Sequence, residues 1–152
     1  MAVAALYRMG MRVRDVIKSK GSDVVTIGAY DSVAALVALL NQHKIGAVVV
    51  TDEAGHVHGI ASERDVVRGL AENGAVVLER TVADLMTAVV HTCEMSEDIA
   101  LLAERMTNHR IRHLPVIEAE HLTAIVSIGD VVKSRLDQLT EERNHLINYV
   151  QG

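Results

Sequence analysis

Two short motifs in this chain place a serine three residues before an aspartate: Ser62 before Asp65, and Ser127 before Asp130. Each motif follows a short apolar run that predicts a strand, and each opens a segment that predicts a helix. A carboxylate at such a corner can accept hydrogen bonds from both hydroxyls of a ribose, each worth roughly 1.5–3 kcal/mol. The free amides of the helix N-terminus also attract an anion. The alternative is a capping box, in which serine and aspartate bond only to the first turn of the helix.

The two motifs belong to a long internal repeat. The segment IGAVVVTDEAGHVHGIASERDVVRGL, which begins at Ile45, aligns with IRHLPVIEAEHLTAIVSIGDVVKSRL, which begins at Ile111. In this alignment Asp65 meets Asp130. A repeat of this kind indicates that one supersecondary unit is used twice. A site built at the first corner therefore has a twin at the second.

The elements that must position these corners follow from periodicity and capping residues. The predicted unit is β-α-β-β-α, used twice. Two such units, packed with pseudo-two-fold symmetry, would cover each other's sheets in an α+β (α/β) fold with an extended C-terminal helix. The predicted boundaries are an N-terminal segment 1–11, a first repeat 12–74, a second repeat 80–136 and a C-terminal helical extension 137–152.

In the first repeat we expect a helical turn over 13–18, strands over 24–27, 47–50 and 57–61, a helix from Asp31–Ser32 to His43–Lys44, and a helix over 62–70. In the second we expect a helical turn over 82–86, strands over 89–92, 114–117 and 122–126, a helix capped by Ser96, and a last helix that opens near Asp130 and ends near Val150.

Basic side chains lie close to both motifs. Arg64 lies inside the first motif, and Arg110, Arg112 and His113 precede the matching strand of the second repeat. Arginine can hold a phosphate through two parallel hydrogen bonds. These residues would form a basic pocket if the fold brings them together. The alternative is that they are solvated surface charges.

Composition excludes several classes of protein. Of the 152 residues, 49% are hydrophobic but only 2% are aromatic, so the core must be aliphatic and the chain lacks platforms for stacking nucleic-acid bases. A net charge of −5 disfavours broad contact with phosphate backbones. A single cysteine excludes a disulfide framework. No apolar run is long enough to span a membrane, and the first thirteen residues lack the basic front, long apolar middle and cleavage site that a secretory leader would show, so we expect none. We therefore expect a soluble, cytoplasmic protein that binds neither nucleic acid nor membrane.

The last helix carries a heptad stripe that its counterpart in the first repeat lacks. Its members are Val132, Leu136, Leu139, Leu146 and Val150, with Arg143 at the skipped position. One interpretation is that this face packs on its own domain. The other is that it pairs with a second subunit, in which case a polar residue in the seam specifies alignment at a cost in stability.

The sequence resembles a tandem CBS-domain pair, the module named after cystathionine β-synthase and also called a Bateman module. The resemblance rests on a repeated V-x-D that precedes Thr26 or Thr92, on the strands IGAVVV and IRHLPV, and on the corner G-I-x-S-x-x-D. It covers about residues 12–136. CBS pairs bind adenosine-containing ligands in the cleft between their repeats and do not usually transform them.

The resemblance implies a regulatory module that binds AMP, ADP, ATP or NAD(H), has no catalytic cofactor or metal, and is not an enzyme. It implies that Asp65 and Asp130 hold ribose diols, with Ser62 and Ser127 beside ribose or phosphate. Together with the C-terminal helix, it implies a homodimer through the CBS faces and that helix. The other expected nucleotide-binding residues are Thr26, Gly46, Ala47, Arg64, Thr92, Arg110, Arg112, His113, Pro115 and Gly129.

The two corners differ, because Arg64 in the first is replaced by Gly129 in the second. We expect unequal sites, with the tighter phosphate contact where Arg64 meets the Arg112 region. A rival interpretation is a purely structural dimerisation module with empty clefts. His56 and His58 could share a metal or simply be solvated in a turn. Cys93 is expected to be buried and inert rather than a redox thiol.

Overall fold

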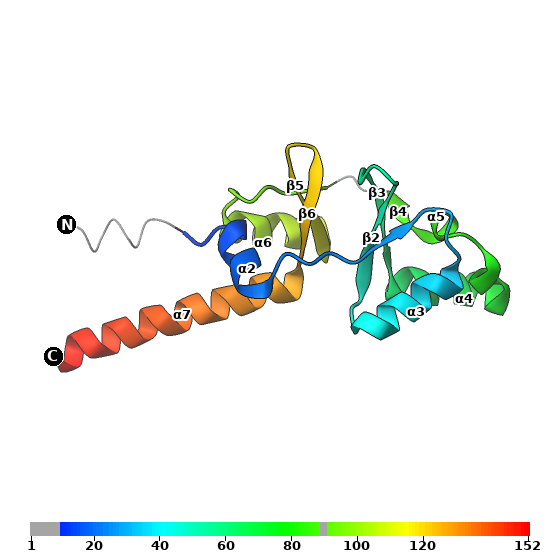
Figure 1. Cartoon of the computed structure of the whole chain (residues 1–152). Helices are drawn as coiled ribbons and strands as arrows, with labels where there is room; N and C mark the ends of the chain where they lie inside the picture. The colour runs from blue at the N-terminus through cyan, green and yellow to red at the C-terminus, as the bar shows by residue number, and fades with distance from the viewer. Residues whose placement is uncertain (1–9, 89–90) are drawn as a thin grey trace. The chain divides into compact units, whose positions relative to one another are not determined.

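The computed structural model describes residues 10–88 and 91–152, which alternate between helices and strands (Figure 1). In chain order the elements are α2 (Val13–Lys20), β1 (Thr26–Gly28), α3 (Val33–His43), β2 (Ala47–Thr51), β3 (Val57–Ser62), α4 (Glu63–Asn73), the 3₁₀ helix η1 (Gly74–Glu79), α5 (Val82–Leu85), β4 (Thr87–Ala88), α6 (Ile99–Asn108), β5 (His113–Glu118), β6 (His121–Ser127) and α7 (Ile128–Gln151). The mixed α+β fold predicted from the repeat is confirmed. None of the helices in the described ranges is both long and apolar enough to cross a membrane.

The chain forms two compact units. One contains residues 23–92 and 115–125. The other contains α2, α6 and α7, together with the first two residues of β5 and the last two of β6. In the first unit, β1, β2, β3 and β4 form one sheet in that order, parallel between β1 and β2 and antiparallel elsewhere. Strands β5 and β6 pair with each other.

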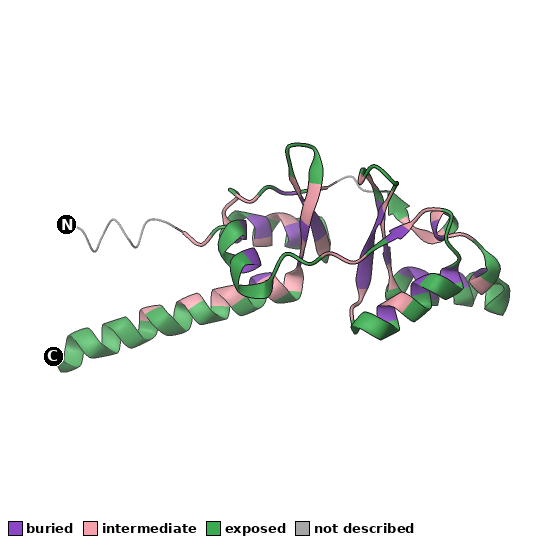
Figure 2. Ribbon diagram, viewed as in Figure 1, coloured by how far each residue is buried: buried purple, intermediate pink, exposed green. Residues whose placement is uncertain are grey.

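The centre of the four-stranded sheet is β2. Its residues Val48, Val49 and Val50 have no exposed surface, which confirms the strand predicted from the continuous apolar run. Figure 2 shows the burial of this strand in purple. Leu36 of α3 and Val66 of α4 pack into the same aliphatic cluster. The core of this unit is therefore built from aliphatic side chains, as the composition predicts.

The strand expected over residues 89–92 is wrong for the two of these residues that the structure describes. Residues 89 and 90 lie outside the described ranges, and His91 and Thr92 are not in a strand. The nearby strand is β4, which pairs with the outer edge of β3. Gly59 permits this pairing, because a Cβ there would lie 2.7 Å from the carbonyl oxygen of Thr87.

The short V-x-D helices are exchanged between the repeats. Helix α2 opens the first repeat but binds the segment before α6, in the second repeat, where the Val13 amide donates to the Glu97 carbonyl at 2.9 Å. In the equivalent bond, the Val82 amide of α5 donates to the Asp31 carbonyl before α3, at 2.8 Å. The repeats in the sequence are therefore not the compact units, and the boundaries 12–74 and 80–136 remain a prediction.

Helix starts follow the capping rules, with one correction. Ser32 caps α3 as predicted, since its hydroxyl accepts from the Ala35 amide at 3.0 Å. Ser96 does not cap α6. The cap is Asp98, whose Oδ1 accepts from the amides of Ala100 at 2.8 Å and Leu101 at 3.2 Å. The repeat offset that aligns Ile45 with Ile111 also aligns Ser32 with Asp98, a signal that was present in the sequence.

We predict that Asp98→Ala lowers the free energy of unfolding by about 1 kcal/mol, because two first-turn amides lose their acceptor. Ser96→Ala is the matched control and should change the free energy little, since the side chain of Ser96 does not cap the helix. Urea denaturation followed by circular dichroism measures both. An equal or larger loss in Ser96→Ala would contradict this assignment.

Candidate functional site

The first predicted corner is a closed capping box. The backbone amide and the hydroxyl of Ser62 both donate to Oδ2 of Asp65 at 2.9 Å, and the Asp65 amide donates back to the Ser62 hydroxyl at 3.3 Å. Oδ1 of Asp65 accepts from Nη2 of Arg68 at 2.6 Å. Only 6% of the Asp65 side chain is exposed. The carboxylate is therefore buried, capped and paired with a cation.

The second corner repeats the capping box but differs in its cation. The Ser127 amide donates to Oδ2 of Asp130 at 2.9 Å, and the Asp130 amide donates to the Ser127 hydroxyl at 3.1 Å. Nζ of Lys20, on α2, lies 2.5 Å from the same Oδ2. The Asp130 side chain is 23% exposed. The exchanged helix α2 thus supplies the counter-ion of this corner.

Burial of Asp130 opposes its ionisation, but the hydrogen bonds from Lys20 and Ser127 outweigh burial and lower its pKa below the ordinary value. Asp130 is therefore an anion at neutral pH. Its Oδ1 accepts no hydrogen bond from the part of the chain that the structure describes, so one oxygen of this carboxylate keeps its acceptor capacity.

An equivalent backbone bond ties each corner to the residue just before the neighbouring antiparallel strand, β2 or β5. The Glu63 amide donates to the Gly46 carbonyl at 2.9 Å, and the Ile128 amide donates to the Arg112 carbonyl at 2.8 Å. Ala47 pairs with Ser62 across β2 and β3. The structure thus places Gly46 and Ala47 at the first corner and Arg112 at the second, and their contact with a nucleotide remains a prediction.

The remaining predicted site residues take no part in the hydrogen bonds that close the two capping boxes. Arg110 has a left-handed φ of 55°, like Lys44 at the end of α3, so it closes α6. Thr26, Arg64, Thr92, Arg112 and Gly129 are exposed, whereas His113 is half-buried and Pro115 is buried in β5. The basic pocket expected from Arg64 and Arg112 remains a prediction.

Sequence reasoning missed the two cations that hold the aspartates. Arg68 lies one helical turn after Asp65, and the i,i+3 spacing is a signal that could have identified it. Lys20 is separated from Asp130 by 110 residues. Only the exchange of α2 brings Lys20 to the second corner, and local sequence does not reveal that exchange.

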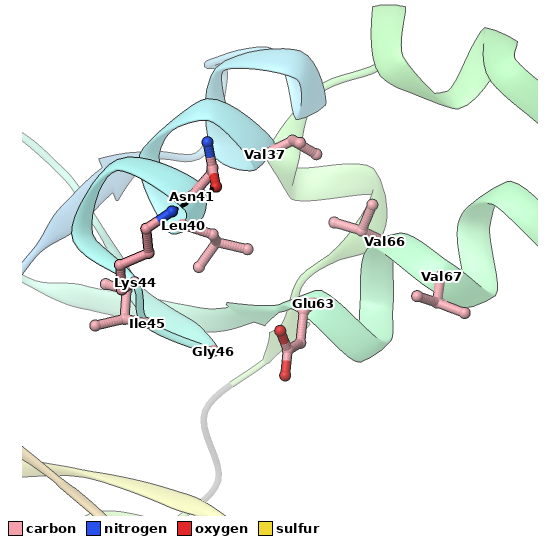
Figure 3. A pocket seen from close by; sticks show the side chains of 9 residues that line it. All are labelled: Val37, Leu40, Asn41, Lys44, Ile45, Gly46, Glu63, Val66 and Val67. Carbon is pink, nitrogen blue, oxygen red and sulfur yellow. Dashed lines mark hydrogen bonds between the residues drawn. The ribbon is translucent and has the colours of Figure 1, made fainter.

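A pocket that the sequence did not suggest opens between α3 and α4 (Figure 3). Its volume is about 560 Å³, within the range of small-molecule sites. Val37 and Leu40 from α3 and Val66 from α4 give it apolar walls, while Lys44 and Glu63 carry opposite charges at its rim. Gly46 also lines it, so the pocket reaches the residue whose carbonyl accepts from Glu63 at the first corner.

His56, in the turn between β2 and β3, and His58, in β3, both contact the carboxylate of Asp52. Oδ2 of Asp52 lies 3.1 Å from Nδ1 of His56 and 3.1 Å from Nε2 of His58. The backbone hydrogen bond from His56, aided by the side-chain bonds from His58 and His56, lowers the pKa of Asp52 below its ordinary range. Over the described ranges, no cluster of three or more His, Cys, Asp or Glu side chains could hold a metal ion.

Cys93 is buried, as predicted. Burial raises the pKa of its thiol to about 12, and the charge of Glu97 acts in the same direction. The thiolate is the reactive form of cysteine. A thiol that ionises only in strong base is a poor nucleophile at neutral pH, so this environment favours the inert interpretation over the redox one.

We predict that Lys20→Gln lowers the free energy of unfolding by about 1 kcal/mol at pH 7, where Asp130 is ionised. The lowered pKa of Asp130 means that this stabilisation is present above about pH 4 and is lost as the pH falls through the pKa of the folded state. Lys18→Gln, which removes the same charge from an exposed position of α2, is the control. Urea denaturation at pH 7 and pH 3 measures the difference. A deficit that is as large at pH 3, or equal in the control, would contradict the pairing.

Comparison with known proteins agrees with this geometry. The CBS domain profile matches residues 13–72 and 82–137. A mitochondrial CBS domain-containing protein of Arabidopsis thaliana, CBSX3, is 34% identical over 148 residues, which are 92% of this chain and 72% of that protein. The crystal structure of a CBS-domain containing protein from Agrobacterium tumefaciens is 46% identical, with a TM-score of 0.79 over 82% of this chain and 99% of that one.

A second similar crystal structure contains ligands. The CBS domain pair of protein MJ0100, in complex with 5′-methylthioadenosine and S-adenosyl-L-methionine, is 26% identical, with a TM-score of 0.72 over 83% of this chain and 98% of that one. The profile covers both repeats, and its two matches contain both serine–aspartate corners. The chain therefore belongs to the CBS domain family and contains a tandem pair of CBS domains.

Proposed function

We propose that this protein is a regulatory module that binds an adenosine-containing ligand, AMP, ADP, ATP or NAD(H), without transforming it. The observation that carries the proposal is the pair of partly or fully buried carboxylates, Asp65 and Asp130, at equivalent strand-to-helix corners. The adenosine compounds bound to the CBS pair of MJ0100 support this ligand class.

The chemistry of the corners suits a ribose. Ribose hydroxyls are donors, and a carboxylate held by a capping box is an acceptor in a fixed position. The exposed cations Arg64, Arg110 and Arg112 are available for phosphate. An adenine ring would lie between aliphatic side chains, since the chain contains no Phe or Trp. Thr26 and Thr92 remain proposed contacts at the edge of the base.

We propose no catalytic step. Each corner serine is engaged with its own aspartate, and the buried thiol of Cys93 is protonated at neutral pH. Ligand binding would act by favouring one arrangement of the domain pair over another, because a ligand shifts an equilibrium by its difference in affinity for the two states. Location in the cytoplasm is part of the same proposal.

The test is a thermal-shift panel of AMP, ADP, ATP, S-adenosylmethionine, NAD and NADH. A ligand at one hundred times its Kd should raise the melting temperature by roughly 5–10 °C. The double variant Asp65→Asn and Asp130→Asn should fold but lose this shift. Asp84→Asn is a matched control, because Asp84 forms the same capping box with Thr81 on α5 and is not in a strand-to-helix corner.

No shift with any of the six compounds would refute adenosine binding. An undiminished shift in the double variant would refute the role of the corners. A loss of the shift in Asp84→Asn as well would show that the variants act through stability rather than through contact with the ligand.

A second candidate function, assembly into a homodimer, is supported by helix α7. Its stripe residues Val132, Leu136, Leu139, Leu146 and Val150 are 50–83% exposed, so the interpretation in which this face packs on its own domain is wrong. Figure 2 shows most of this helix in the colour of exposed residues. The face toward α2 and α6 is a different one, which includes the buried Val131.

The charges of α7 favour antiparallel pairing of two copies. In a parallel pair, Arg143 of one copy would lie opposite Arg143 of the other in the seam. An antiparallel register that pairs Leu136 with Leu139 of the second copy instead sets Arg143 against Val132. The same register places Arg135 beside Glu142 of the second copy, which forms two ion pairs at the edge of the seam.

We predict that Leu139→Glu converts a dimer into a monomer, because it places a charge in the middle of the apolar stripe. Leu101→Glu is the control, since Leu101 is also an exposed leucine, 67% against 50% for Leu139, and lies on α6 outside the stripe. Sedimentation velocity at micromolar concentration measures the masses. A monomeric parent protein, or a dimer that survives Leu139→Glu and not Leu101→Glu, would contradict the assignment to α7.

A further inference from the structure

The two corners differ in how much of each carboxylate is free for a ligand. Ribose recognition through vicinal hydroxyls needs acceptor sites on the carboxylate that are not already occupied. Both corners use one oxygen of the aspartate for the capping box. The outer oxygen, Oδ1, therefore decides whether a ribose can bind, and its surroundings differ between Asp65 and Asp130.

At the first corner, Oδ1 is occupied. Arg68 donates to it at 2.6 Å, a short charge-assisted bond. The arginine side chain is 57% exposed while the aspartate is 6% exposed, so the guanidinium covers the carboxylate from the solvent side. A ribose could reach Asp65 only after Arg68 moves away.

At the second corner, the cation binds the inner oxygen instead. Lys20 donates to Oδ2, the oxygen that also accepts from the Ser127 amide. Oδ1 has no partner among the described residues, and the side chain is 23% exposed. Lys133, which occupies the place of Arg68 one turn after Asp130, forms no ion pair within the described ranges. Lys20 therefore neutralises the corner without closing it.

We infer that the two sites fill unequally: Asp130, held by Lys20, takes the ribose of the first nucleotide, and Arg68 keeps the Asp65 corner closed as a built-in competitor. This inference rests on the proposed function and specifies it further. The expectation from sequence is unequal sites, with the tighter phosphate contact where Arg64 meets the Arg112 region; the present inference concerns the ribose and assigns it to the Asp130 corner. Lys20 also favours phosphorylated ligands. Its positive charge offsets that of Asp130, which reduces the repulsion between this corner and the phosphate of a nucleotide.

Isothermal titration calorimetry with AMP, and separately with NADH, tests the inference on the full chain. We expect one high-affinity site per chain in the parent protein. Arg68→Gln should open the Asp65 corner and reveal a second site, or tighten a weak second site at least tenfold. Lys133→Gln is the matched control at the equivalent position of the other repeat and should leave the stoichiometry at one.

Single aspartate variants assign the occupied corner. Asp130→Asn should abolish the high-affinity site, whereas Asp65→Asn should leave it intact. Lys20→Gln should weaken AMP at least tenfold while it changes the affinity for uncharged adenosine less, a difference that loss of stability alone would not produce. Circular dichroism spectra confirm that each variant is folded.

The outcomes separate this inference from the function it rests on. If neither AMP nor NADH binds the parent protein, adenosine binding itself fails. If a nucleotide binds but Asp65→Asn removes the high-affinity site, or if the parent protein binds two equivalents with equal affinity, the ligand class stands and the unequal filling is refuted.

Discussion

The capping box at each strand-to-helix corner is the constraint on which the proposed site depends. It fixes an aspartate by hydrogen bonds from the serine three residues before it, and so holds a charged acceptor rigidly in a partly buried position. The first amide of the helix then donates to the residue just before the neighbouring strand, Gly46 or Arg112, which ties the start of the helix to the sheet. One local motif thus stabilises the helix and orients the carboxylate proposed to bind ribose, so the structural and functional interpretations of Ser62 and Asp65 are not rivals.

The exchange of the short helices explains why the two corners are not copies of each other. Helix α2 follows the same backbone pattern against the second repeat that α5 follows against the first. It is longer than α5, however, and its last residue, Lys20, reaches Asp130. The first corner has its cation on its own helix, at Arg68. The duplicated unit therefore has two different electrostatic environments, even though its backbone hydrogen bonds repeat.

Much of the fold was predictable because it is encoded locally. The buried run of β2, the caps at Ser32, Ser62 and Ser127, and the length of α7 follow from apolar spacing and helix-start chemistry, and the structure confirms them. The error at Ser96 arose because the hydroxyl lies two residues before Asp98, a stronger cap that the repeat offset would have identified. The contact of Lys20 with Asp130 and the pocket beside Gly46 were not predictable, because both depend on segments distant in sequence.

The most direct test of the account is a crystal structure of the chain grown with AMP. The account predicts electron density for one well-ordered nucleotide, with its ribose hydroxyls within hydrogen-bond distance of the Asp130 carboxylate and with Arg68 still on Asp65. A nucleotide bound elsewhere, while Asp130 contacts only Lys20 and Ser127, would contradict it.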